Sequence, residues 1–65
     1  MDKSRWSIGE YTFEVEFLSL RSYRVTVYTN GHVTYHEPIV SAYNEAQAAL
    51  VTYAALKDII VREIN

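Results

Sequence analysis

Apolar and polar residues alternate with a period of two in three stretches of the first part of the chain. In residues 11–18, "YTFEVEFL", tyrosine, phenylalanine and valine alternate with threonine and glutamate. The same alternation runs through residues 23–29, "YRVTVYT", and through 32–37, "HVTYHE", which ends near Pro38. This period is typical of half-buried β-strands, and proline marks the exit from a ladder because it has no N–H to donate. The sequence therefore predicts three strands.

The pattern changes to a helical one after residue 43. From Asn44 to about Glu63 there is no glycine or proline, alanine is frequent, and apolar residues recur at helical spacing. Asn44 is the preferred N-cap, with Gln47 three residues later as in a capping box, and Ser41 is the competing cap. We expect an α+β fold, a three-stranded antiparallel meander (β-β-β-α) with one long C-terminal helix packed on one sheet face. Residues 1–10 are expected to be a polar N-terminal arm, and 11–65 a single domain.

Asn30-Gly31 is the strongest turn signal in the chain. A two-residue loop would set the apolar residues of one strand against the polar residues of the next, whereas a three-residue loop over 29–31 pairs Val27 with Val33. The three-residue loop is therefore predicted. It places six side chains on the open face of the sheet as a candidate partner-binding surface: Arg24, Thr26, Tyr28, His32, Thr34 and His36.

The two histidines stand four residues apart, a spacing that suits zinc when it lies on a helix. Along a strand, however, four residues span about 13 Å, and zinc–nitrogen bonds are about 2.1 Å long. Strand 23–29 also separates Glu14 and Glu16 from the histidines by about 10 Å. We therefore expect no metal site and no cofactor.

Catalysis is not expected either. A nucleophile needs a base within hydrogen-bond reach, and the serines fall in the arm, the turns and the approach to the helix. Gly9 and Gly31 are the only glycines, so the chain has no glycine-rich phosphate loop. The sequence predicts a protein that is not an enzyme.

The predicted helix carries two apolar stripes. The broad stripe is expected to cover the sheet; it consists of Ala46, Ala49, Leu50, Tyr53, Leu56, Ile60 and Ile64, widened by Ala54 and Val61. The opposite stripe is a candidate interface with a partner or in a homodimer and consists of Ala48, Val51, Ala55 and Ile59. Alanine is also a good helix former, and scattered surface apolar residues are normal, so the second stripe has a structural explanation as well.

Length and charge limit the function classes. The chain has 65 residues, no cysteine and a net charge of −2 at pH 7, so disulfides are excluded and no general attraction to phosphate backbones is expected. The N-terminus lacks the layout of a signal peptide, and no apolar run reaches the length of a membrane span. A cytoplasmic protein without membrane contact is the expectation.

The stretch "NEAQAAL", residues 44–50, resembles the helix start of double-stranded-RNA-binding domains and of the arm-site-binding domains of phage and transposon integrases. That resemblance implies nucleic-acid binding, although the lysine cluster and the basic sheet of those families are missing here. The meander followed by this helix also resembles very small phage proteins that inhibit host machinery, including one that blocks bacterial RNA polymerase. This second resemblance implies a small regulator or inhibitor of a host protein.

Six tyrosines in 65 residues favour a protein interface, where tyrosine, tryptophan and arginine are enriched. We therefore predict a small non-enzymatic protein-binding module, of the kind encoded by a phage or mobile element. The alternative is a nucleic-acid-binding domain that uses the open sheet face and the N-terminal arm with Lys3, Arg5 and Trp6, because arginine and aromatic groups stack on unpaired bases.

Overall fold

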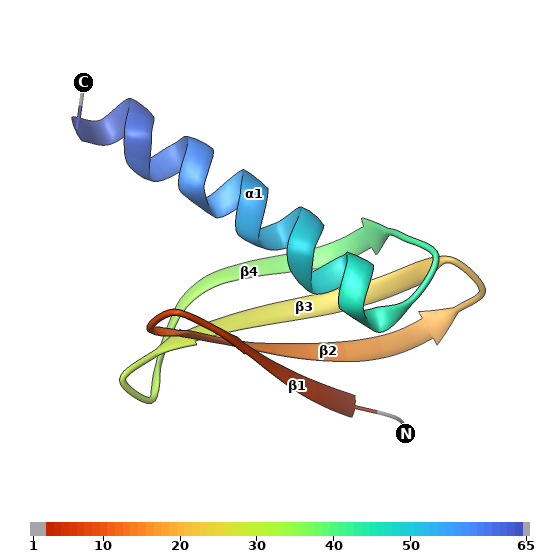
Figure 1. Cartoon of the computed structure of the whole chain (residues 1–65). Helices are drawn as coiled ribbons and strands as arrows, with labels where there is room; N and C mark the ends of the chain where they lie inside the picture. Colours follow the sequence, from red (N-terminus) through yellow and green to blue (C-terminus); the bar gives the residue numbers. More distant parts are fainter. Residues whose placement is uncertain (1–2, 65) are drawn as a thin grey trace.

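Four stretches of alternating residues form strands, and the alanine-rich stretch after them forms a helix (Figure 1). The computed structural model describes the backbone of residues 3–64 and the side chains of 3–62. The elements are β1 (Lys3–Ile8), β2 (Tyr11–Ser19), β3 (Ser22–Thr29), β4 (His32–Ser41) and α1 (Glu45–Ile64). The strands make one antiparallel sheet in the order β1-β2-β3-β4, with α1 on one face. The α+β class and the C-terminal helix are as predicted, but the sheet has four strands instead of three.

The additional strand comes from the segment expected to be a polar arm. Residues 3–8 pair with β2 without interruption, from Lys3 opposite Glu16 to Ile8 opposite Tyr11. A tight two-residue turn makes this hairpin, and Gly9 supplies its left-handed backbone with φ of 60°. The segment also alternates, but with serine at one of its inward positions, so its apolar signal is weak.

The β3–β4 turn is shorter than predicted. Thr29 pairs with His32, which leaves a two-residue turn of Asn30 and Gly31 with φ of 53° and 80°. Two consecutive positive φ values are typical of a type I′ turn, which matches the twist of the flanking strands. The predicted three-residue loop is therefore wrong.

A β-bulge in β4 restores the alternation that the short turn would otherwise invert. The register shifts between Val27 and Tyr28, so that Val27 pairs with Tyr35 while Tyr28 pairs with Val33. Thr34 is the extra residue, and the predicted pairing of Val27 with Val33 is wrong. From Tyr35 onward the bulge has the same effect on facing as a longer loop, because either one adds a single residue between the paired positions.

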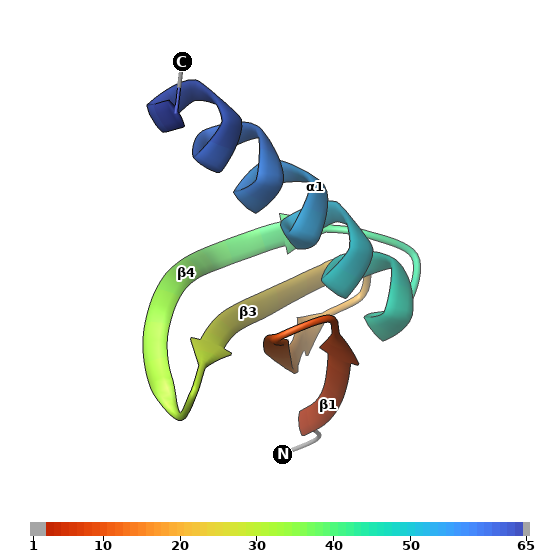
Figure 2. The same cartoon turned by 60° about the vertical axis from the view of Figure 1, so that its left-hand side comes forward.

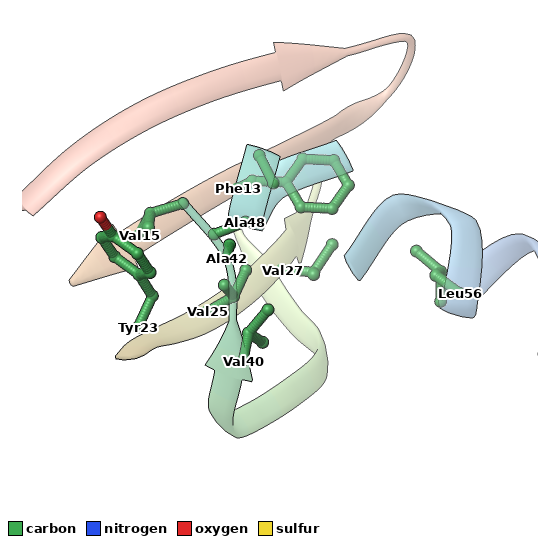
Figure 3. Packing of buried hydrophobic residues seen from close by; sticks show 10 residues of the cluster. Phe13, Val15, Tyr23, Val25, Val27, Val40, Ala42, Ala48 and Leu56 are labelled. Carbon is green, nitrogen blue, oxygen red and sulfur yellow. The ribbon is translucent and has the colours of Figure 1, made fainter. Parts of the chain in front are cut away.

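The hydrophobic core lies between α1 and the covered face of the sheet (Figure 3). It consists of Phe13, Val15, Tyr23, Val25, Val27, Val40, Ala42, Ala48, Ala49 and Leu56. The helix crosses the sheet obliquely, and its C-terminal part projects beyond the strands (Figure 2). Alanines at the start of α1 let the helix backbone approach the sheet closely.

The buried face of α1 is rotated relative to the prediction. Ala48 and Thr52 are buried, whereas Leu50, Ala54 and Val61 of the predicted core stripe are exposed. Thr52 satisfies its buried hydroxyl by donating to the carbonyl oxygen of Ala48 at 2.9 Å. The side chain of Ile64 lies outside the described residues.

The helix begins as predicted. The Asn44 Oδ1 atom accepts a hydrogen bond from the Gln47 N–H at 2.8 Å, and the Gln47 side chain accepts one from the Tyr43 N–H. Asn44 is therefore the N-cap, and Ser41 belongs to β4. Over residues 3–64, no helix has the apolar length that crossing a membrane requires.

Candidate protein-binding surfaces

The open face of the sheet carries three rows of side chains, each running across neighbouring strands. The first row consists of Lys3, Glu16 and Arg24. The second row consists of Arg5, Glu14, Thr26 and His36, and the third of Ser7, Thr12, Tyr28 and Val33. The first two rows are mainly charged and the third is uncharged. β1 contributes two of the three permanent cations, so the arm and the open face are one surface.

The two glutamates of the open face are paired with these cations. An oxygen of Glu14 accepts from the Arg5 guanidinium at 3.0 Å, and its other oxygen lies 4.0 Å from Lys3 Nζ. Glu16 Oε1 accepts from Arg24 Nη1 at 3.1 Å. The Glu16 side chain is only 11% exposed because the two neighbouring strands flank it, so water screens its contact with Arg24 less than it screens a pair on the open surface.

Four of the six side chains predicted on the open face are there. Arg24, Thr26 and Tyr28 project from β3, and His36 lies beside Thr26, with 3.1 Å between His36 Nδ1 and Thr26 Oγ1. Tyr28 stands next to Val33, which was predicted to pair with Val27 and so to share its face. The two-residue turn accounts for this exchange, because it reverses the facing of His32 and Val33 before the bulge at Thr34 restores the alternation from Tyr35 onward.

His32 and Thr34 were predicted on the open face, and that placement is wrong. His32 pairs with Thr29, which itself pairs with Tyr11 on the helix side of the sheet. The Thr34 hydroxyl lies 3.1 Å from that of Thr29 and donates to the carbonyl oxygen of Val27 at 3.4 Å. Both residues therefore belong to the margin of the covered face.

The bulge also separates the histidines. Because His32 and His36 point to opposite sides of the sheet, one ion cannot contact both rings. Among the described residues, no cluster of three or more histidine or carboxylate groups could hold a metal ion.

The predicted second stripe of α1 divides between the core and the surface. Ala48 is fully buried, so its assignment to an exposed interface is wrong, and Ala55 is half-buried. Val51 and Ile59 are exposed. The outer face of α1, which we define as Leu50, Val51, Ala54 and Val61, instead includes residues that were predicted to be buried.

A further apolar surface lies where the β2–β3 turn meets the connection between β4 and α1 (Figure 1). We call Phe17, Leu18, Leu20 and Tyr43 the turn-end cluster. All four are exposed, Leu20 by 84% and Tyr43 by 70%. The sequence prediction missed this cluster, although a turn with a leucine, directly after a strand end with another leucine, and without Gly, Pro, Asn or Asp was a usable signal.

Arg21 joins the two halves of the turn-end cluster. It has a left-handed φ of 64°, its carbonyl oxygen accepts the Ala42 N–H at 3.3 Å, and its guanidinium carbon lies 4.4 Å from the centre of the Tyr43 ring. A non-glycine residue in this conformation costs about 1–2 kcal/mol. The backbone contact and the cation–π contact hold the turn against the connection despite this cost.

Two shallow grooves flank the helix. One of about 390 Å³ is lined by Ser4, Trp6, Asn44, Glu45 and Ala46, and one of about 290 Å³ by Glu10, Tyr11, Thr29, Thr34, Tyr35, Leu56, Ile59 and Ile60. In the second, the Tyr35 hydroxyl donates to Glu37 Oε2 at 2.8 Å, and this hydrogen bond raises the pKa of Tyr35 above its ordinary value. In the described part of the chain, no histidine lines either groove, so neither sets a nucleophile beside an imidazole base.

Comparison with known protein families, with curated proteins and with solved structures finds no match to this chain. The function of the protein is therefore inferred from its own surfaces.

Proposed function

We propose that this protein is a non-enzymatic protein-binding module and that the turn-end cluster is its main contact surface. The observation that carries the proposal is the concentration of exposed leucine and aromatic side chains at one end of the sheet. Large apolar side chains gathered on a surface are typical of interaction sites. Tyrosine and arginine, which Tyr43 and Arg21 supply here, are the residues most often found at interface hot spots.

The backbone at Arg21 supports the same proposal. Residues in sparsely populated conformations occur most often at binding and active sites, because a requirement other than stability keeps them. Glycine or asparagine at this position would remove the strain, as the Asn30–Gly31 turn of the same sheet illustrates. An arginine that stacks on an exposed tyrosine presents a planar, charged contact group instead.

The open sheet face and the outer face of α1 are secondary contact surfaces in this proposal. On the sheet, Arg24, Thr26, Tyr28 and His36 offer hydrogen-bonding groups around the uncharged row. On the helix, the outer face suits a second helix, from a partner or from a second copy of the chain, because alanine at its centre permits close approach.

The test compares three baits in a pull-down from lysate of the source organism. We expect wild-type protein to retain a stoichiometric protein partner after nuclease treatment, and Leu20→Asn to lose it. Leu50→Asn is the comparison variant for the secondary surface on the helix, since Leu50 is an equally bulky leucine, 57% exposed on the outer face of α1; we expect it to retain the partner. Both variants should keep the wild-type stability within about 0.5 kcal/mol, because neither leucine is buried. Loss of the partner with Leu50→Asn alone would move the interface to the helix.

Nucleic-acid binding is a second candidate because β1 brings Lys3 and Arg5 onto the same face as Arg24. That face carries three permanent cations and two glutamates, which leaves a surplus of one positive charge. Phosphate contacts supply most of nucleic-acid affinity, and here both glutamates compete for the cations. Fluorescence anisotropy with a single-stranded oligonucleotide at low and moderate salt distinguishes the candidates. Affinity that falls steeply with salt and with Arg5→Gln would favour nucleic acid.

A further inference from the structure

The two edges of the sheet differ in regularity. β4 contains Pro38, which has no N–H to donate, and its pairing with β3 shifts register twice. β1 contains no proline and pairs with β2 at six consecutive positions without a shift. Proline and bulges protect an edge from further pairing, so β4 is the blocked edge. β1 has neither, and its edge charges, Lys3 and Arg5, oppose pairing with a basic strand but not with an acidic one.

The register identifies which backbone groups β1 presents at its outer edge. The two-residue turn makes Ile8 and Tyr11 a hydrogen-bonded pair, and such pairs alternate along an antiparallel ladder. The backbone groups of Lys3, Arg5 and Ser7 therefore point away from β2. These three residues span about 13 Å, enough to pair with a partner segment of about five residues.

The side chains of β1 specify the chemistry of that segment. On the open face, the side chains of Lys3 and Arg5 are 52% and 69% exposed, and within the described chain their carboxylate partner, Glu14, lies on the inner side. A guanidinium has five N–H donors, so one carboxylate does not saturate Arg5. Residues directly opposite across a ladder share a face, and opposite charges there are favourable. The open-face positions of the added strand are therefore acidic.

On the helix side, β1 presents an apolar surface to the same segment. Trp6 is 40% exposed and lines the groove of about 390 Å³ at the start of α1. An apolar side chain of the added strand fits beside the indole ring. β2, which pairs with the inner edge of β1, already has the alternation of acidic and apolar residues that we expect of the added strand: Glu14 and Glu16 alternate with Phe13 and Val15.

We infer that the outer edge of β1 accepts an extended strand of a partner protein in which acidic and apolar residues alternate. A second copy of β1 is a poorer occupant, because any face-matched pairing brings two sets of Lys3 and Arg5 together, and residues 3–8 place no carboxylate between them. The inference goes beyond the turn-end cluster, since each surface can bind without the other.

A capped synthetic peptide alternating glutamate and valine tests the inference in an NMR titration of the full chain. Saturable shifts are expected at the outward amides of Lys3, Arg5 and Ser7. A peptide with lysine in place of glutamate should not bind. Equal shifts with both peptides, or no shifts at millimolar peptide, would overturn the inference, as would a dimer in sedimentation that Ser7→Pro dissociates.

Two variants separate backbone pairing from charge. Ser7→Pro removes one outward N–H and no bond to β2, so it should abolish peptide binding while the core resonances remain. The double change Lys3→Gln and Arg5→Gln should weaken peptide binding about tenfold, because it removes two charge pairs between β1 and the peptide. Arg62→Gln, which removes an exposed cation on α1, is the matched control and should change nothing. Leu20→Asn should also leave peptide binding intact, so failure of the proposed function and failure of this inference are distinguishable.

Discussion

On β2, Phe13 and Val15 point toward the helix, whereas Glu14 and Glu16, their neighbours in sequence, point to the open face. The covered face excludes water, and its side chains stabilise the fold through burial. The open face carries ion pairs between neighbouring strands, and the basic side chains of these pairs are exposed to water. Each such pair stabilises the fold only weakly. The comparison indicates that one face supplies stability while the other is free to carry specific contacts.

The largest expected effect comes from truncating the covered face. Phe13 is fully buried and packs edge-on against Tyr53, with 5.9 Å between ring centres. Phe13→Ala should cost about 3–5 kcal/mol, which is about the whole stability expected for a domain of this size. Far-UV circular dichroism should show a largely unfolded chain. Val33→Ala, on the exposed uncharged row, is the control and should lie within about 0.5 kcal/mol of wild type. Similar costs for the two variants would remove the distinction between the faces.

An intermediate effect is expected from the Glu16–Arg24 pair, and it should be asymmetric. Arg24→Gln leaves a nearly buried carboxylate without its partner, whereas Glu16→Gln leaves an arginine that is 45% exposed and can be hydrated. The first change should cost about 2 kcal/mol and the second about 1 kcal/mol. Urea unfolding of both variants and of the double variant measures the difference. Equal costs would mean that water reaches Glu16 freely.

The smallest effect concerns Glu37, a carboxylate that accepts a hydrogen bond from Tyr35 at the margin of the covered face. Tyr35→Phe removes the hydrogen bond to Glu37 and should cost about 1 kcal/mol at neutral pH. The hydrogen bond raises the pKa of Tyr35 in the folded state, so the phenol stays protonated there after it begins to ionise in the unfolded chain near pH 10. This stabilising contribution is present below pH 10 and is lost as pH rises through the folded-state pKa. Unfolding measurements above pH 10 should show a smaller loss for the variant than for wild type.

Much of the fold could be predicted because its signals are local. Three strands follow from strict alternation, and the helix start follows from Asn44 and Gln47. β1 escaped prediction because its inward position at Ser4 contributes little apolar signal. β1 is recognised as a strand only from its pairing with β2, which the sequence of residues 3–8 alone does not reveal.

The register and the helix rotation could not be predicted because each has two solutions with the same pattern. A bulge at Thr34 and a three-residue loop both turn Tyr35 inward, and only the ladder distinguishes them. For the helix, large side chains appeared to mark the core, but close packing selected Ala48 and Thr52 and left Leu50 outside. The same preference for large periodic residues hid Leu20, which lies in a turn.

The position of α1 after all four strands has a consequence for folding during translation. Sequential strands of a meander pair through contacts that are local in the chain, so pairing of the strands does not have to wait for the helix. The covering helix emerges only afterwards, so a nascent sheet exposes Phe13, Val15, Val25 and Val27 to water in the interval. Such a sheet with one bare apolar face is the species most prone to associate with other nascent chains. Docking of α1 is therefore the step that removes this apolar face from water and protects the sheet from association.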